Sequence, residues 1–127
     1  MTSILCVDDE PSTRALLVRL LARHGYRVLQ ASNVRGALGM VQREPELSLI
    51  LLDLNMPELS GFDALKVLKG DDRTKPIPVV VVSSTSRMED VTRAIEMGAH
   101  AVVADPVTDE RVLAAVQRAL GPAAPAA

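Results

Sequence analysis

Four aspartates and one serine stand directly after apolar segments of the chain, and these residue types could bind a metal ion and accept a phosphoryl group. Asp8 and Asp9 follow the first such segment, Asp53 the third, Ser83 the fourth and Asp105 the fifth. Carboxylates about 5 Å apart repel by roughly 3 kcal/mol at an effective dielectric near 20, so a cluster of them needs a cation. Oxygen ligands without His or Cys favour a hard ion such as Mg²⁺.

A carboxylate beside such an ion can also attack phosphorus and form an acyl phosphate. Asp53 is the candidate for this role because it stands singly, whereas Asp8 and Asp9 form a pair suited to metal binding. The Ser83 hydroxyl could donate a hydrogen bond to a phosphoryl oxygen. Any one of these aspartates alone would be an ordinary turn or capping residue. The hypothesis of a site therefore depends on their convergence.

The elements that must position these residues are five short apolar strands, each followed by a stretch with helical periodicity. The predicted strands are residues 3–7, 27–31, 48–52, 77–82 and 101–104. Continuous Val, Ile and Leu runs are typical of parallel strands covered on both faces, and the more mixed segment 27–31 suits a sheet edge. The alternation predicts an α/β domain with a parallel sheet and helices on both faces. Ligands of such sheets bind beyond the carboxyl ends of the strands, which is where the aspartates stand.

The composition limits the class of protein. The 127 residues are 48% apolar with a formal net charge of -2, which fits one compact domain and gives no attraction to a polyanion. No stretch approaches the roughly 18 apolar residues of a membrane helix, and Cys6 alone allows no intramolecular disulfide. We expect a domain over residues 1–121, a Pro/Ala-rich tail or linker over residues 122–127, and a cytoplasmic location without direct nucleic-acid or membrane contact.

With these residues in place, the chain resembles the receiver domain of bacterial two-component response regulators from residue 4 to about residue 120. The resemblance depends on short motifs that occur together and in the family's order. They are Val-Asp-Asp-Glu-Pro at 7–11, Leu-Leu-Asp-Leu-Asn-Met-Pro at 51–57 followed by Ser60-Gly61, the segment 78–83, Gly98-Ala99, and Pro106.

The resemblance implies a flavodoxin-like (CheY-like), doubly wound five-stranded parallel sheet of order 2-1-3-4-5 with five helices. It implies that Asp53 is the phosphoacceptor, that Mg²⁺ is held by Asp9, Asp53 and the backbone carbonyl of Asn55, and that Asp8 contributes through water. Ser83 would take the place of the switch Ser or Thr. A histidine kinase or a phosphotransfer protein would supply the phosphoryl group, and a downstream effector protein or domain would receive the signal, with a homodimer as one alternative.

Two positions depart from the family pattern. The lysine that pairs with the phosphorylated aspartate is replaced by Asp105, which puts an anion beside a group with nearly two negative charges. The switch aromatic is replaced by Val102, a stiff, small side chain without a comparable rotamer change. We therefore expect an atypical receiver.

Three alternatives to a coupled phosphoacceptor remain open. A pseudo-receiver would act as a fixed protein-docking module without phosphorylation. A domain whose phosphorylation is short-lived or uncoupled would serve as a phosphate sink. A phosphohydrolase with an aspartyl nucleophile fits less well, because 127 residues supply no substrate-covering cap. A binding and signalling module is expected rather than an enzyme.

Overall fold

The described strands form one parallel sheet. The computed structural model describes residues 2–44, 46–56, 58–83 and 87–120. In the order β2-β1-β3-β4-β5, each strand pairs in parallel with its neighbours. This confirms the sheet order expected from the sequence. The strands are β1 (Ser3–Val7), β2 (Arg27–Ala31), β3 (Leu49–Leu52), β4 (Val79–Val82) and β5 (Ala101–Val103).

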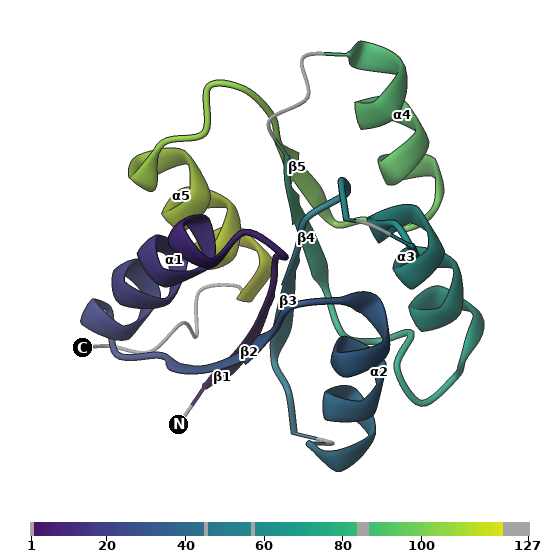
Figure 1. Cartoon of the computed structure of the whole chain (residues 1–127), viewed down its shortest axis with the longest axis horizontal. Coiled ribbons are helices and arrows are strands. Elements are labelled where there is room, and N and C mark those ends of the chain that lie inside the picture. The colour runs from purple at the N-terminus through teal and green to yellow at the C-terminus, as the bar shows by residue number, and fades with distance from the viewer. Residues whose placement is uncertain (1, 45, 57, 84–86, 121–127) are drawn as a thin grey trace.

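Helices cover both faces of this sheet. Figure 1 shows the sheet nearly edge-on, with α1 and α5 on one face and α2, α3 and α4 on the other. Among the described residues, no helix has the length and apolar character needed to cross a bilayer. The helices are α1 (Pro11–Arg23), α2 (Val34–Arg43), α3 (Gly61–Gly70), α4 (Met88–Glu96) and α5 (Asp109–Leu120).

The burial of the strands follows from these two layers. Every residue of β1, β3 and β4 is buried, whereas β2 is largely exposed or half-buried, as its mixed sequence predicts for a sheet edge. Side chains of successive strand residues point to opposite faces. In β1, Ile4 and Cys6 therefore belong to the core under α1 and α5, and Leu5 and Val7 to the core under α2 and α3.

Three strands are shorter than the sequence predicts, and for β4 the backbone shows the reason. Pro78 has no N–H to donate to a ladder. Its carbonyl still accepts a hydrogen bond from the Ile50 amide at 3.0 Å, but the Ile77 amide donates to Thr74 in the preceding turn. The ladder of β4 consequently begins at Val79. In addition, β3 begins one residue later, and β5 ends one residue earlier, than predicted.

Local caps fix the two loops that carry the aspartates. Helix α1 begins with Pro11, whose ring suits a first helical turn. The Glu10 carboxylate caps this helix by accepting a hydrogen bond from the Ser12 amide. Helix α3 begins with a reciprocal capping box between Ser60 and Asp63. The chain therefore leaves β1 and β3 along defined paths. Residues 122–127, the predicted tail or linker, lie outside the described residues.

Candidate functional site

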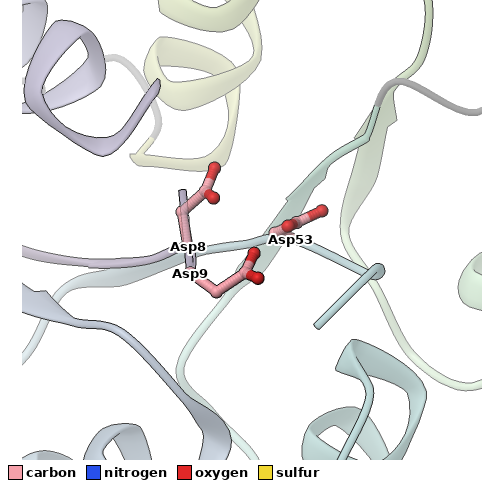
Figure 2. Close-up of side chains that lie close together, drawn as sticks. All are labelled: Asp8, Asp9 and Asp53. Carbon is pink, nitrogen blue, oxygen red and sulfur yellow. The ribbon is translucent and has the colours of Figure 1, made fainter. Parts of the chain in front are cut away.

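Three carboxylates meet at one edge of the sheet. The Asp8 amide donates to the Ala31 carbonyl at 3.1 Å and the Asp53 amide donates to the Val7 carbonyl at 3.0 Å. These bonds extend the ladders one residue past β1 and β3, so both aspartates stand at the carboxyl ends of neighbouring strands. Asp8, Asp9 and Asp53 each offer a carboxylate oxygen within 4.8 Å of the other two. Figure 2 shows these three side chains together.

Burial gives the three carboxylates different properties. Asp8 is buried, Asp53 is half-buried and Asp9 is exposed. Burial is the main cause that raises the pKa of Asp53 from 3.8 to about 6, and the charges of Asp8 and Asp9 raise it further, although the Asn55 amide opposes the shift. Burial likewise raises the pKa of Asp8, against the opposing Glu10 amide. Placing three anions here therefore costs free energy.

The donor set fits a hard divalent cation. The ion pairs among the described residues join other carboxylates: Glu44 with Arg27, Asp71 with Arg73, and Glu89 with Arg87. The Asp8 carboxylate accepts a hydrogen bond from the Glu10 amide at 2.9 Å, and the Asp53 carboxylate accepts one from the Asn55 amide at 3.1 Å. Oxygen ligands of this kind, without sulfur or imidazole, suit Mg²⁺. A divalent ion here would offset the mutual repulsion of the carboxylates.

Ser83 and Asn55 border the cluster. Ser83 is 2% exposed and follows β4, where its amide donates to the Val103 carbonyl at 3.0 Å. The Asn55 side-chain amide lies 3.5 Å from the Ser83 hydroxyl oxygen, and the Asn55 backbone amide donates to Asp53. The sequence does not predict this contact between the Asn55 and Ser83 side chains, because no local sequence pattern indicates it. The predicted role of the Asn55 carbonyl as a metal ligand stays a prediction.

Asp105 is not part of the group of carboxylates. Asp105 is exposed. Of the four aspartates predicted to converge, Asp8, Asp9 and Asp53 form the group described above, and Asp105 does not belong to it. The turn that carries Asp105 is held instead by Arg111, whose guanidinium donates to the carbonyls of Ala104 and Pro106. Val102, at the other departure from the family pattern, is half-buried in β5 and pairs with Val81.

Gly61 is a further residue on which the site depends. The amide of Gly61 donates to the Leu54 carbonyl at 2.9 Å. A Cβ atom at this position would lie 2.6 Å from the Leu54 Cα and closer still to the Asp53 carbonyl oxygen. The first turn of α3 therefore packs directly on the backbone that carries Asp53. The Ser-Gly pair is visible in the sequence, but its contact with Asp53 depends on how α3 packs.

The raised pKa of Asp53 predicts a pH dependence of metal binding. Above about pH 6, Asp53 carries a charge, whereas below that pH a proton occupies the carboxylate and competes with the cation. We expect the apparent Mg²⁺ affinity to fall by about tenfold per pH unit below pH 6 and to level off above pH 7. Isothermal titration calorimetry at pH 5, 6 and 7.5 measures this directly. An affinity that does not change over this range would contradict the assignment of Asp53 as a ligand.

Comparison with known proteins identifies the class. The family model of the response regulator receiver domain matches residues 4–117, almost the whole chain. The chain therefore belongs to the response regulator receiver family, whose members are signalling modules of two-component systems. This confirms the resemblance seen in the sequence.

Individual relatives and structures agree with this membership. The chain is 32% identical to the protein PilH of Pseudomonas aeruginosa over 94% of this chain and 98% of that protein. It is 38% identical to the two-component response regulator ORR7 of Oryza sativa over 82% of this chain, where the match spans 50% of that relative's length. The structure of the chemotaxis protein CheY4 of Vibrio cholerae matches with a TM-score of 0.87 and 29% identity, covering 94% of this chain and 99% of that chain.

Proposed function

We propose that this receiver takes a phosphoryl group on Asp53 in a reaction that needs Mg²⁺. The observation that supports the proposal is the meeting of Asp8, Asp9 and Asp53 at one sheet edge, within 4.8 Å of one another. A half-buried carboxylate beside two others is suited to act as a nucleophile once a cation offsets the local negative charge. Asp9, Asp53 and the Asn55 carbonyl would hold the cation directly, and Asp8 would hold it through water.

Each side chain has a distinct part in the proposed reaction. An Asp53 carboxylate oxygen attacks the phosphorus of a phosphohistidine; the new O–P bond forms as the P–N bond breaks, and the imidazole keeps the electron pair. The Asn55 amide at 3.1 Å holds the Oδ1 atom of Asp53 in place, and the other carboxylate oxygen would be the one that reacts. The Ser83 hydroxyl, near the Asn55 side chain, donates to an oxygen of the transferred group. Bound Mg²⁺ would supply positive charge for the phosphoryl oxygens.

A stable phosphoryl mimic tests this proposal without a kinase. Fluoroberyllate binds a carboxylate oxygen in the tetrahedral arrangement of an acyl phosphate. With Mg²⁺ present at saturation, fluoroberyllate at about 100 times its Kd should raise the unfolding free energy by about 2.7 kcal/mol. The same addition to Asp53→Asn should leave the melting temperature unchanged. Equal stabilisation of both proteins would rule out Asp53 as the phosphoacceptor.

Asp105 supports the further proposal that the switch is atypical. An exposed anion replaces the family's lysine, so phosphorylation gains no ion pair at this position. Asp105→Lys should lengthen the lifetime of the acyl phosphate by about threefold, or about 0.6 kcal/mol, which is the scale of an exposed ion pair. Loss of radiolabel after removal of the phosphodonor measures this lifetime.

Asp109→Lys is the matched control for that prediction. Asp109 is an exposed aspartate in the first turn of α5, so its replacement changes the net charge by the same amount. We expect Asp109→Lys to keep the wild-type lifetime. If Asp105→Lys and Asp109→Lys change the lifetime of the acyl phosphate equally, the change in net charge explains the effect and the position of Asp105 does not.

The proposal extends to partners and location. A histidine kinase or a phosphotransfer protein would donate the phosphoryl group, and an effector protein or domain would read the result through contacts rather than through turnover. The net charge of -2 supports protein partners over direct binding to nucleic acid. We place the receiver unit at residues 1–121 and its action in the cytoplasm, with residues 122–127 as a tail or linker. Size measurement with and without phosphorylation would test for a homodimer.

A further inference from the structure

The Arg14 side chain links three parts of the molecule next to the carboxylate cluster. Arg14 lies in the first turns of α1 and is half-buried. Its Nη1 atom donates to the carbonyl oxygen of Asp8 at 2.7 Å, and its Nε atom donates to the Gln30 side chain of β2 at 3.2 Å. One guanidinium therefore ties the helix to the edge strand and to the loop that carries Asp8 and Asp9.

The carbonyl that Arg14 holds belongs to the peptide unit between the two aspartates. The amide of Asp8 is already fixed by its bond to the Ala31 carbonyl. Since a peptide unit is planar, holding the Asp8 carbonyl also sets the direction in which the chain enters Asp9. Asp9 is the exposed member of the cluster, so solvent rather than packing surrounds much of its side chain.

We propose that Arg14 is a positioning residue that presets the Asp8–Asp9 peptide unit for a divalent cation. Among the described residues, Arg14 makes no ion pair with a carboxylate, and its hydrogen bonds go to a carbonyl and an amide oxygen. Arg14 therefore acts through the backbone, in the way that outer-shell partners orient metal ligands. The inference rests on the proposed Mg²⁺ site.

The sign of the effect separates positioning from simple charge. Arg14 is a cation close to the site, so its field repels Mg²⁺, and removing the charge alone would strengthen binding. Loss of positioning acts in the opposite direction, because Asp9 would have to be ordered as the cation binds. The two explanations thus predict opposite changes in Mg²⁺ affinity.

The experiment is a calorimetric titration of the full chain with MgCl₂. Arg14→Met, which removes the charge and all donors, should weaken Mg²⁺ binding by about tenfold. Arg19→Met removes the same charge from an exposed position of the same helix and should bind Mg²⁺ as tightly as wild type, or slightly more tightly. Arg14→Lys keeps a donor for the Asp8 carbonyl and should recover part of the lost affinity. Wild-type or tighter binding by Arg14→Met would overturn the proposal.

A second variant keeps the test informative if Arg14→Met folds poorly. Gln30 is an exposed residue of the edge strand β2. Gln30→Leu removes only the acceptor of the hydrogen bond from the Arg14 Nε atom. It should weaken Mg²⁺ binding by about threefold while circular dichroism shows an intact fold, and unchanged affinity would contradict the proposal. A wild type that binds no Mg²⁺ would overturn the metal site itself, and the inference about Arg14 with it. If the wild type binds Mg²⁺ tightly and the Arg14 variants bind it equally tightly, only the inference about Arg14 is overturned.

Discussion

Replacing Asp9 with alanine is expected to weaken Mg²⁺ binding by at least about 100-fold, or roughly 2.7 kcal/mol. Asp9 is the exposed carboxylate of the cluster, and its oxygen lies within 4.8 Å of oxygens of Asp8 and Asp53. Its loss removes one of three negative charges that attract the cation. The same change relieves repulsion on Asp8 and Asp53, so the metal-free protein should melt at a slightly higher temperature. Calorimetric titration and a melting curve without metal measure the two effects.

Asp9→Ala should therefore lower the Mg²⁺ affinity and raise the stability of the metal-free protein. This combination is expected when the removed carboxylate is a metal ligand within a group of anions. Asp105→Ala is the matched control, because it removes an exposed aspartate that is not part of the group. We expect it to keep the Mg²⁺ affinity within about twofold of wild type, because an exposed charge that offers no ligand oxygen acts on the cation only through electrostatics screened by solvent and salt. If Asp9→Ala retains wild-type affinity, any bound ion sits elsewhere on the molecule.

Gly61→Ala is expected to destabilise the protein by about 3 kcal/mol or more. The added methyl group would meet the Asp53 carbonyl oxygen and the Leu54 Cα, and these backbone atoms lie between β3 and α3 and have little room to move. Overpacking against side chains costs about 1 to 3 kcal/mol, and backbone yields less readily. The shift needed to admit the methyl group would also displace Asp53. Urea unfolding and Mg²⁺ titration of the folded fraction should both show a loss.

Gly70→Ala, at the other end of α3, provides the comparison. A Cβ atom at Gly70 would have no neighbour within 4 Å. Alanine restricts the unfolded chain more than glycine, so this variant should be neutral or more stable by about 0.4 to 1 kcal/mol. Equal urea midpoints for Gly61→Ala and wild type would show that α3 does not press on the backbone of Asp53.

The parallel sheet followed from the hydrophobic pattern and the chain connectivity, whereas its strand order was expected from the resemblance to receiver domains. Continuous apolar runs that alternate with amphipathic stretches leave few arrangements other than a parallel sheet with two helical layers. The ends of the strands were less predictable. At β4, for example, apolar composition continues through Ile77 and Pro78, but the ladder begins only where an N–H is available to donate.

Part of the site was predictable for the same reason. Asp8 and Asp53 are the first residues after neighbouring parallel strands, so the sheet itself brings them together. Asp105 lies two residues beyond the end of β5, where the path of the turn decides the direction of the side chain, and it is not part of the group. Strand connectivity alone does not determine that path.

The contacts of Arg14 and Asn55 could not be read from the sequence. The bond from Arg14 to the Asp8 carbonyl depends on how α1 rotates as it leaves β1, and the bond to Gln30 depends on the position of the edge strand. The approach of Asn55 to Ser83 joins two loops that are 28 residues apart. Both contacts depend on how the helices and loops pack, and neither is indicated by residue spacing or composition in the sequence.

The most direct test of a Mg²⁺-dependent phosphoacceptor is intact-protein mass spectrometry with rapid quenching after incubation with acetyl phosphate. We expect a phosphoryl adduct on the wild type in the presence of Mg²⁺. The adduct should be absent when Mg²⁺ is chelated and absent in Asp53→Ala. No adduct on folded wild-type protein at the shortest quench times would contradict the proposal and favour a docking module that works without phosphorylation. An adduct of equal size on Asp53→Ala would contradict the assignment of the phosphoacceptor.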